Sequence, residues 1–376
     1  MKKKILSSAL VLALCATMLS ATSPIDGIAP LSNAGAYVPT LTSAQNGTKV
    51  ALLDGNIYEY AKDYVKYKSM SYYNGTDQFA PVPVTLSWTS EAGAEYYTVK
   101  LSLFEDLSAA EYFVTFDRSL VVEELLMGKT YYYQVIAHYA DKTVLSRVFS
   151  FETAYLPRTI EAEGVSNTRD FGGFYTVDGK HRVRQGLIYR GGEMTDITAA
   201  GIEKMLYTYN IKTDLDLRGN LSTPLGSAVN YVGVSAPYYV GSNGILTESY
   251  RDALITEIRT FADPDNYPIY VHCALGRDRT GTLCFLINAL CGVGEKELYM
   301  DYETSFFSVK GCYGNTPLQP MIESSFTPLY NYLNTYPTED EDATLAERTE
   351  AFMKEYLGIT QSEIDSIRSI LLEEVA

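Results

Sequence analysis

Residues 267–293 read YPIYVHCALGRDRTGTLCFLINALCGV, and they predict a strand, a tight loop and a helix in succession. The apolar run 269–271 is rich in β-forming residues and predicts a buried strand. The apolar stretch 280–290 has helical spacing, and Gly292 follows it as a helix-terminating residue. The sequence therefore places Cys273 at the carboxyl end of a strand, with a short loop leading from it into a helix.

The loop after Cys273 has the residue types of an anion site. Unpaired N–H groups and the helix dipole at a helix start form a cradle for a tetrahedral anion. Gly276 supplies the backbone freedom of a tight turn, and the planar fork of Arg279 can bind two oxygens of the anion. The same field favours the Cys273 thiolate, which can attack a bound phosphoryl group and form a phosphocysteine. Thr280 can donate a hydrogen bond to the sulfur when it leaves.

HCALGRDRTG, residues 272–281, resembles the H-C-x5-R-[ST] signature of the protein tyrosine phosphatase superfamily. Its DRTG ending is similar to that of the secreted bacterial tyrosine and phosphoinositide phosphatases. The resemblance implies an α/β domain whose central, mainly parallel sheet is flanked by helices, and a mechanism without cofactor or metal. His272 is expected to orient the loop rather than act as a base. The phosphate-binding residues implied by the signature are Ala274, Leu275, Gly276 and Arg277, the last at a position where Lys is common.

Three further segments resemble the same branch. Residues 167–173, NTRDFGG, match its N-x-R-D-x-G-G motif, and YRGGEM, residues 189–194, makes Arg190 a candidate substrate-binding residue. The DLR run ends another predicted strand. Because ligands bind at the carboxyl ends of strands in open α/β sheets, Asp216 and Arg218 are expected on the same rim as Cys273.

Two aspartates are candidates for the general acid that protonates the leaving group. Many relatives in the superfamily carry this Asp on a mobile loop before the cysteine, but residues 235–246 contain no Asp or Glu. Asp278 in the loop and Asp216 at the neighbouring strand end are both retained, and Asp278 is slightly favoured. The alternative for Asp278 is a structural ion pair with Arg279.

A basic cluster surrounds a predicted hairpin turn at Asp178-Gly179. Its members are Lys180, His181, Arg182, Arg184 and Arg190. One interpretation is a solvated hairpin. The other is a positive wall that steers a phosphorylated substrate, which together with Arg277 and Arg279 would suit a highly charged inositol polyphosphate.

Residues 82–153 predict a separate all-β domain, because five short alternating segments are divided by polar turns at the spacing of a β-sandwich. Trp88 and the run LMGKTY, residues 126–131, resemble a fibronectin type III domain and its tyrosine corner. The resemblance implies a sandwich over 81–154 with a spacing or adhesive role, and contact with a surface or glycan is an alternative.

The remaining boundaries follow from composition. Residues 1–23, MKKKILSSALVLALCATMLSATS, predict an export signal, and hence a secreted or cell-surface bacterial protein; the apolar stretch is too short to span a membrane. Cys15 raises lipidation as an alternative. Residues 24–80 are expected to be an N-terminal linker or extension, in which the pattern of 57–67 is typical of a short amphipathic helix, and residues 155–376 the phosphatase domain. Its helices are expected at 197–209, 248–261, 295–304, 324–336, 342–357 and 360–374, the last with a capping box of Thr360 and Glu363.

Charge and cysteine content limit the function further. The chain has 376 residues and a formal net charge of -16, which argues against binding to nucleic acid or an anionic membrane. Cys284 and Cys291 lie about two helical turns apart, too far for a disulfide between them. The leading hypothesis is a cysteine-dependent phosphatase for phosphotyrosine, with phosphoserine, phosphothreonine or phosphoinositides as further substrates. The alternatives are an inositol polyphosphate phosphatase and a non-catalytic protein that binds phosphorylated ligands.

Overall fold

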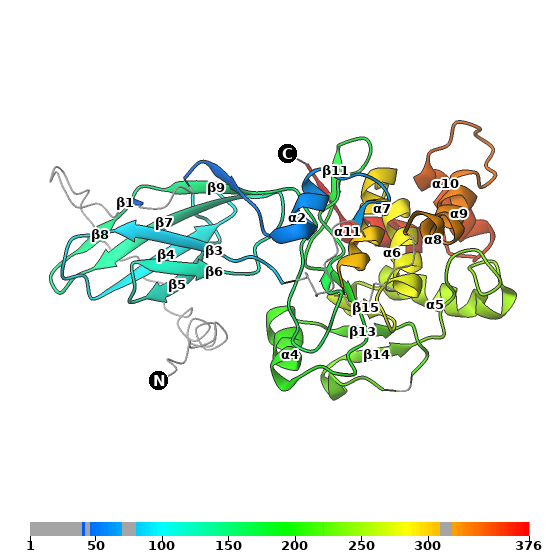
Figure 1. Cartoon of the computed structure of the whole chain (residues 1–376), viewed down its shortest axis with the longest axis horizontal. Helices are drawn as coiled ribbons and strands as arrows, with labels where there is room; N and C mark the ends of the chain where they lie inside the picture. Colours follow the sequence, from blue (N-terminus) through cyan, green and yellow to red (C-terminus); the bar gives the residue numbers. More distant parts are fainter. Residues whose placement is uncertain (1–39, 42–45, 70–79, 221, 309–317, 376) are drawn as a thin grey trace.

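The computed structural model describes residues 40–41, 46–69, 80–220, 222–308 and 318–375. The predicted export signal, Cys15 and Cys312 lie outside these residues. The described chain forms two bodies side by side, an all-β body and an α/β body (Figure 1). The chain passes between them before residue 84 and after residue 153. No helix among the described residues has the length and apolar character needed to cross a membrane.

The all-β body consists of two sheets around one apolar core. One sheet has the order β2-β9-β7-β4-β5 with β8 paired to β7, and the other has the order β1-β3-β6. Inward and outward residues alternate along β7, as a sheet with one buried face requires. The strands are β1 Thr40–Leu41, β2 Thr48–Val50, β3 Val84–Thr89, β4 Tyr96–Ser102, β5 Glu111–Thr115, β6 Ser119–Val122, β7 Thr130–His138, β8 Thr143–Leu145 and β9 Phe149–Thr153.

The turn before β7 has the hydrogen bond of a tyrosine corner. The Leu126 N–H donates to the Tyr131 hydroxyl at 2.8 Å, within the LMGKTY run. Trp88, Tyr133 and Phe151 are buried in the core between the sheets. The described strands thus enclose an apolar core between two sheets, and the fibronectin type III sandwich stays a prediction.

The α/β body is built on a five-stranded sheet with the order β10-β12-β15-β13-β14. The pairs β12–β15, β15–β13 and β13–β14 are parallel, and β10 is antiparallel to β12, so the predicted central, mainly parallel sheet is confirmed. The central strand β15 is buried along its whole length, which explains its unbroken apolar run. The strands are β10 Arg169–Asp170, β12 Ile188–Gly191, β13 Thr213–Asp216, β14 Asn230–Gly233 and β15 Ile269–His272.

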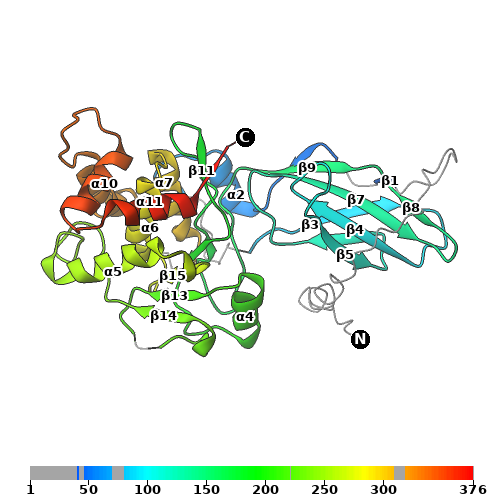
Figure 2. The ribbon, with the colours of Figure 1, turned by 180° about the vertical axis from the view of Figure 1, so that it is seen from behind.

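Helices cover this sheet, and α6 (Asp278–Leu290) is buried from Thr280 to Leu290. Figure 2 shows α5 and α11 on the face opposite to that seen in Figure 1. The predicted helix over 197–209 is α4 continued by a π-helical segment, Lys204–Thr208. The other helices are α4 Ala199–Glu203, α5 Arg251–Ala262, α7 Glu295–Thr304, α8 Leu318–Ser324, α9 Phe326–Asn334, α10 Leu345–Glu355 and α11 Gln361–Leu371.

The predicted end of the last helix is wrong. Its capping box is confirmed, since Thr360 and Glu363 exchange backbone and side-chain hydrogen bonds. However, α11 ends at Leu371, and residues 372–374 form β16 (Leu372–Glu374), which pairs with β11 (His181–Val183). The turn at Asp178-Gly179 is present with Gly179 at a φ of 68°, but β11 has β16 as its ladder partner rather than a long hairpin strand.

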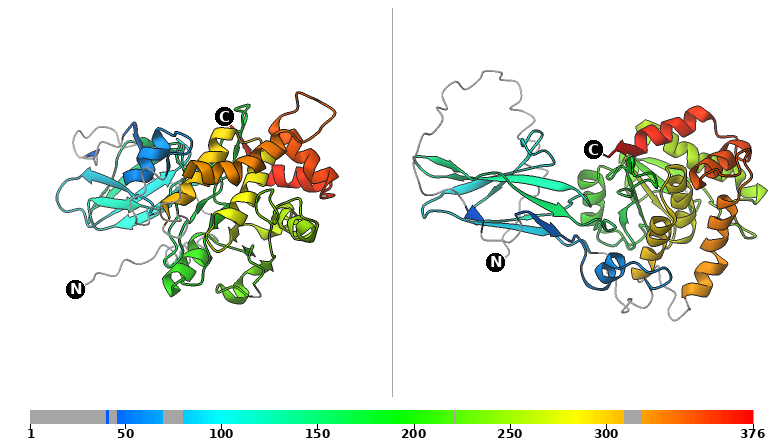
Figure 3. Two further views of the ribbon diagram at one scale, coloured as in Figure 1. Left: turned by 45° about the vertical axis from the view of Figure 1, so that its right-hand side comes forward. Right: turned by 90° about the horizontal axis from the view of Figure 1, so that it is seen from above.

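The segment before the sandwich is not a linker, which corrects the predicted boundary at residue 80. β2 extends the sandwich by pairing with β9, and helix α2 (Gly55–Lys62) then packs on the α/β body. Ile57 and Tyr60 are buried in the core of that body, and the Tyr60 hydroxyl donates to Glu303 of α7 at 3.1 Å. Figure 3 shows α2 lying against the α/β body, separate from the sandwich sheets. The chain therefore contributes to the α/β core both before and after the sandwich.

Candidate active site

The predicted strand, loop and helix are confirmed, and Cys273 lies where β15 ends. Its side chain is buried, with an exposed fraction of 2%. Gly276 adopts a φ of 69°, and a Cβ at this position would lie 2.4 Å from the backbone of Gly191. The loop thus requires glycine here for two reasons, its left-handed conformation and its close packing against the end of β12.

Three consecutive carbonyl groups of this loop accept hydrogen bonds from outside it. The donors are Glu193 N to Ala274 O at 3.2 Å, Asn167 Nδ2 to Leu275 O at 2.8 Å and Arg190 Nη2 to Gly276 O at 2.9 Å. In a planar trans peptide, the N–H of the next residue points the opposite way from the carbonyl. The N–H groups of Leu275 and Gly276 have no acceptor in the described part of the chain. The loop therefore turns amide donors toward its inner side, as an anion cradle needs.

A buried ionic cluster holds the outer side of the loop. Asp301 of α7 accepts from Arg190 Nη1 and, at 2.9 Å, from Arg169 Nε. Arg169 Nη1 also donates to Asn167 Oδ1 at 2.5 Å. Arg190 has no exposed surface, so the prediction that it contacts substrate is wrong. It supports the loop from behind, through Gly276 O and Asp301.

Arg279 occupies the rim of the site at the carboxyl end of β13. Its Nη1 donates to Leu217 O at 3.1 Å, and within the described residues the other guanidinium nitrogens have no protein acceptor. Glu257 of α5, which the sequence reasoning missed, lies near this guanidinium. Burial raises the pKa of Glu257 well above its usual value, and the charge of Arg279 opposes this only in part.

The side chain of His272 is paired behind the loop, whereas the Thr280 hydroxyl does not make its expected hydrogen bond. His272 Nε2 lies 2.9 Å from Asp214 Oδ1, and both side chains are buried. This pairing fixes the imidazole behind the loop, which is consistent with an orienting role. The Thr280 hydroxyl is buried and has no hydrogen-bond partner among the described residues, so its expected bond to the Cys273 sulfur is not formed in this structure.

Asp216 is fully occupied by its neighbour Arg218. Arg218 Nε donates to Asp216 Oδ1 at 2.8 Å, and Nη2 donates to Oδ2 at 2.7 Å. Arg218 Nη1 also binds Glu193 at 2.5 Å. Burial raises the pKa of Asp216, but the Arg218 hydrogen bonds and the nearby His272 outweigh it, so the net direction is downward. Both side chains reach the predicted rim, yet each is engaged with the other.

Asp278 lies in a different environment at the start of α6. Arg277 Nε donates to Asp278 Oδ1 at 2.9 Å, and the Tyr239 hydroxyl donates to the same oxygen at 2.6 Å. The Asp278 side chain keeps an exposed fraction of 29%. Arg277, which is predicted to bind the phosphate, is buried and paired with Asp278. Asp278 pairs with Arg277 rather than with Arg279.

The predicted positive wall is not formed. Arg182 is buried, and its guanidinium donates to the backbone carbonyls of Met127, Gly128 and Gly173. Arg190 is buried as well, so these two arginines of the basic cluster bind groups of the protein itself. Lys180 and Arg184 are the exposed members.

A model of the tyrosine phosphatase family matches residues 160–373. The chain belongs to this family. The matched residues include the cysteine loop, the Asn167 motif and the DLR run, while the sandwich lies outside them.

Within the tyrosine phosphatase family, the chain is similar to a Cupriavidus necator protein named "Putative tyrosine-protein phosphatase". The two are 28% identical over 164 residues, which make up 37% of this chain. The similarity spans 59% of the length of that relative.

Two solved structures show a looser similarity. One is the Siw14 catalytic core, with 15% identity and a TM-score of 0.28 over 45% of this chain and 88% of the other. The other is the core catalytic domain of the PP-IP phosphatase SIW14 from S. cerevisiae in complex with citrate, with 17% identity and a TM-score of 0.24 over 36% of this chain and 86% of the other.

Proposed function

We propose that this protein is a cysteine-dependent phosphatase that hydrolyses phosphate monoesters through a phosphocysteine intermediate. The observation that carries the proposal is the loop itself. Its three outward-bonded carbonyls leave amide donors on the inner side of a loop that begins at Cys273, and Arg279 follows this loop with guanidinium nitrogens that have no protein acceptor among the described residues. A preorganised set of donors around a reacting oxyanion is usually the largest contribution to such catalysis.

In the first step the Cys273 thiolate attacks phosphorus, a sulfur–phosphorus bond forms and the ester oxygen leaves with its bonding electrons. The leaving oxygen takes a proton from a general acid. In the second step water attacks phosphorus and gives a proton to the carboxylate of the general acid, the sulfur–phosphorus bond breaks and the thiolate is regenerated. The buried Thr280 hydroxyl, which has no partner among the described residues, is available to donate to that thiolate.

Asp278 is the proposed general acid. Asp216 is a poor candidate because its side chain is fully buried and its pKa is lowered by the hydrogen bonds from Arg218. Asp278 is partly exposed and lies in the loop that binds the phosphate. Arg277 binds both of its oxygens, as Arg218 does for Asp216, so partial exposure is the feature that favours Asp278.

Phosphotyrosine is the proposed substrate group. A buried thiol such as Cys273 is reached more easily by the long phosphotyrosine side chain than by phosphoserine. An inositol polyphosphate has less support, because Arg182 and Arg190 are buried and paired rather than free to bind extra phosphates. Phosphoinositides and phosphoserine or phosphothreonine are kept as further substrates to test.

Export is also proposed, on the pattern of residues 1–23, and a spacing or adhesive role is proposed for the fibronectin-like sandwich. Fractionation of the producing cells tests export. Protein retained in the cytoplasm with an uncleaved N-terminus would contradict it.

The enzymatic proposal is tested with the purified protein and its Cys273→Ser variant on p-nitrophenyl phosphate, a phosphotyrosine peptide, phosphatidylinositol phosphates and inositol hexakisphosphate. The proposal predicts turnover by the wild type, fastest on the phosphotyrosine peptide, and none by the variant. Full activity of Cys273→Ser would eliminate the mechanism. Tight binding of the phosphopeptide by a wild type that does not hydrolyse any of these substrates would favour the non-catalytic alternative.

A further inference from the structure

The two residues of β10 connect the cysteine loop with the sandwich. Arg169 faces the loop, since it binds Asn167, the donor to Leu275 O, and also binds Asp301. Its neighbour Asp170 faces the other body and accepts from Arg158 Nη1 at 2.8 Å. One short strand therefore supports the loop through one residue and binds Arg158, the residue that contacts the sandwich, through the next.

Arg158 completes the connection to the sandwich. Its Nε donates to Leu125 O at 2.9 Å, and its Nη2 donates to Glu124 O at 3.0 Å and to Glu124 Oε2 at 3.2 Å. The Arg158 side chain is buried, and the Asp170 carboxylate accepts in addition from the backbone of Gly172 and Gly186. The guanidinium thus links the turn before β7 directly to β10.

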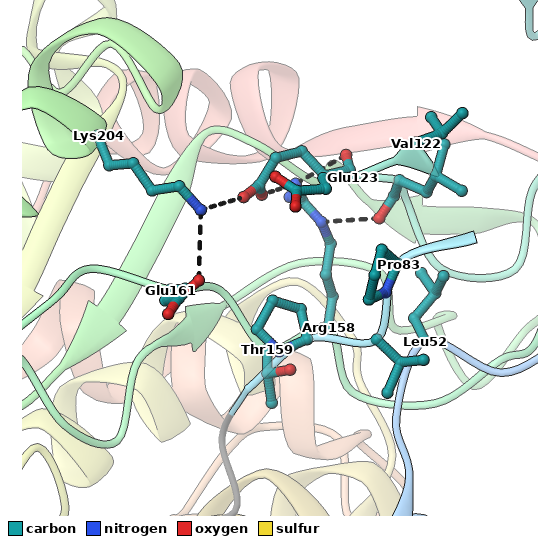
Figure 4. A pocket seen from close by; sticks show the side chains of 12 residues that line it. Leu52, Pro83, Val122, Glu123, Arg158, Thr159, Glu161 and Lys204 are labelled. Carbon is teal, nitrogen blue, oxygen red and sulfur yellow. Dashed lines mark hydrogen bonds and ion pairs between the residues drawn. The ribbon is translucent and has the colours of Figure 1, made fainter. Parts of the chain in front are cut away.

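Glu124, on the sandwich side of this contact, is also held by two residues of the α/β body. Its Oε1 accepts from the Tyr209 hydroxyl at 2.8 Å and from Lys204 at 3.4 Å. In Figure 4, Lys204 and Arg158 converge on this turn, which also lines a pocket between the two bodies. Glu124 has a φ of 60° and Asn167, at the loop end of the connection, a φ of 61°. Such left-handed conformations are uncommon for residues other than glycine and persist only where surrounding contacts fix them.

We propose that Glu124 and Arg158 are positioning residues for the cysteine loop, so that the sandwich and the α/β body act as one catalytic unit. The inference rests on the proposed phosphatase function. The sandwich turn fixes Arg158, Arg158 fixes Asp170 and with it β10, and β10 fixes the donors that turn the loop carbonyls outward. The amide cradle depends on those carbonyls, so its geometry depends on a contact made outside the phosphatase fold.

The experiment compares the full chain with its Glu124→Gln and Arg158→Lys variants. In Glu124→Gln the backbone contact of residue 124 remains and the carboxylate is removed. In Arg158→Lys the positive charge remains, but the planar guanidinium that binds several acceptors at once is removed. The matched control is Lys129→Gln, because the Lys129–Glu373 pair at 2.6 Å also crosses between the bodies but leads to β16 instead of β10. The measurements are kcat and KM on p-nitrophenyl phosphate, the melting temperature, and hydrogen exchange of the peptide that contains residues 273–280.

The two test variants are expected to lower kcat by about tenfold, less than the ~10²-fold that a 1 Å misplacement can cause, and to change KM by less than about twofold. They are also expected to speed exchange of the loop amides at a temperature where the protein is folded. Lys129→Gln is expected to match the wild type in kcat and in loop exchange.

The positioning role is overturned if Glu124→Gln and Arg158→Lys leave both kcat and loop exchange at wild-type values. It is also overturned if Lys129→Gln produces the same losses, because the effect would then be general to the interface. Loop exchange does not require turnover. If the wild type hydrolyses no substrate, the proposed function fails, while the exchange data still decide whether the sandwich contact orders the loop.

Discussion

The Tyr239 hydroxyl donates a hydrogen bond to Asp278 Oδ1 at 2.6 Å, which joins the segment before α5 to the start of α6. Tyr302 of α7 lies 2.5 Å from the same hydroxyl. Residues 235–246, which lack an Asp or Glu of their own, thus supply a tyrosine that orients Asp278, the proposed general acid.

Asp278→Asn is expected to lower kcat by about 10²–10⁴-fold for phenyl phosphate, because a poor leaving group needs the proton that a general acid supplies. For p-nitrophenyl phosphate, whose leaving group is stable as an anion, the loss is expected to be much smaller. Steady-state kinetics with both esters measures the difference. Asp216→Asn serves as the comparison, and a larger selective loss for phenyl phosphate in that variant would transfer the acid role to Asp216.

Arg190→Met is expected to lower the free energy of unfolding by about 3–5 kcal/mol, the usual cost of removing one partner from a buried ion pair. The substitution leaves Gly276 O without its donor and Asp301 with one guanidinium fewer. Urea unfolding measures the change. Arg184→Met is the matched control, since Arg184 belongs to the same basic cluster but is exposed. Equal stability of the two variants would show that Arg190 has no structural role behind the loop.

Asp216 is expected to stabilise the fold in a pH-dependent way. Its pKa in the folded protein is lowered, whereas an unfolded Asp has a pKa of about 3.9. Its contribution is therefore fully present above the unfolded pKa and is lost as pH falls through the lower, folded pKa. Asp216→Asn should destabilise the protein at pH 7 by about 1.5–3 kcal/mol, the range for hydrogen bonds to a charged group. Urea unfolding from pH 7 to pH 3 should show this difference shrinking, and a difference independent of pH would contradict the assignment.

Ile57→Ala is expected to destabilise the α/β body by about 2–5 kcal/mol, because it removes a buried side chain from a packed core. The result would confirm that α2 belongs to the phosphatase body although it precedes the sandwich in the chain. Val65→Ala, at a residue with more than half of its surface exposed, is the control and should have little effect. Thermal unfolding followed by circular dichroism measures both, and an unchanged melting temperature for Ile57→Ala would show that α2 is dispensable.

The sequence predicted those features that depend on neighbouring residues. The strand, cysteine loop and helix over 267–293 were predictable because periodicity and the signature lie in one continuous stretch. The capping box of Thr360 and Glu363 was predictable for the same reason, since its two members are three residues apart.

Features that depend on distant partners were not predictable in this way. The YRGGEM run makes Arg190 a candidate substrate contact, and no neighbouring residue indicates its partner Asp301, which is 111 residues away in the sequence. Tyr239 was missed because nothing near it signals that its hydroxyl reaches Asp278. The role of residues 49–69 was missed because a short amphipathic helix does not show which body it packs against.

The most direct test of the account is to trap the enzyme during turnover. The protein is mixed with p-nitrophenyl phosphate, quenched in acid and digested, and the modified residue is located by fragmentation mass spectrometry. The account predicts a phosphoryl group on Cys273, with none on the buried Cys284 of the same stretch and none in the Cys273→Ser variant. Turnover without phosphate on Cys273, together with activity in Cys273→Ser, would contradict it.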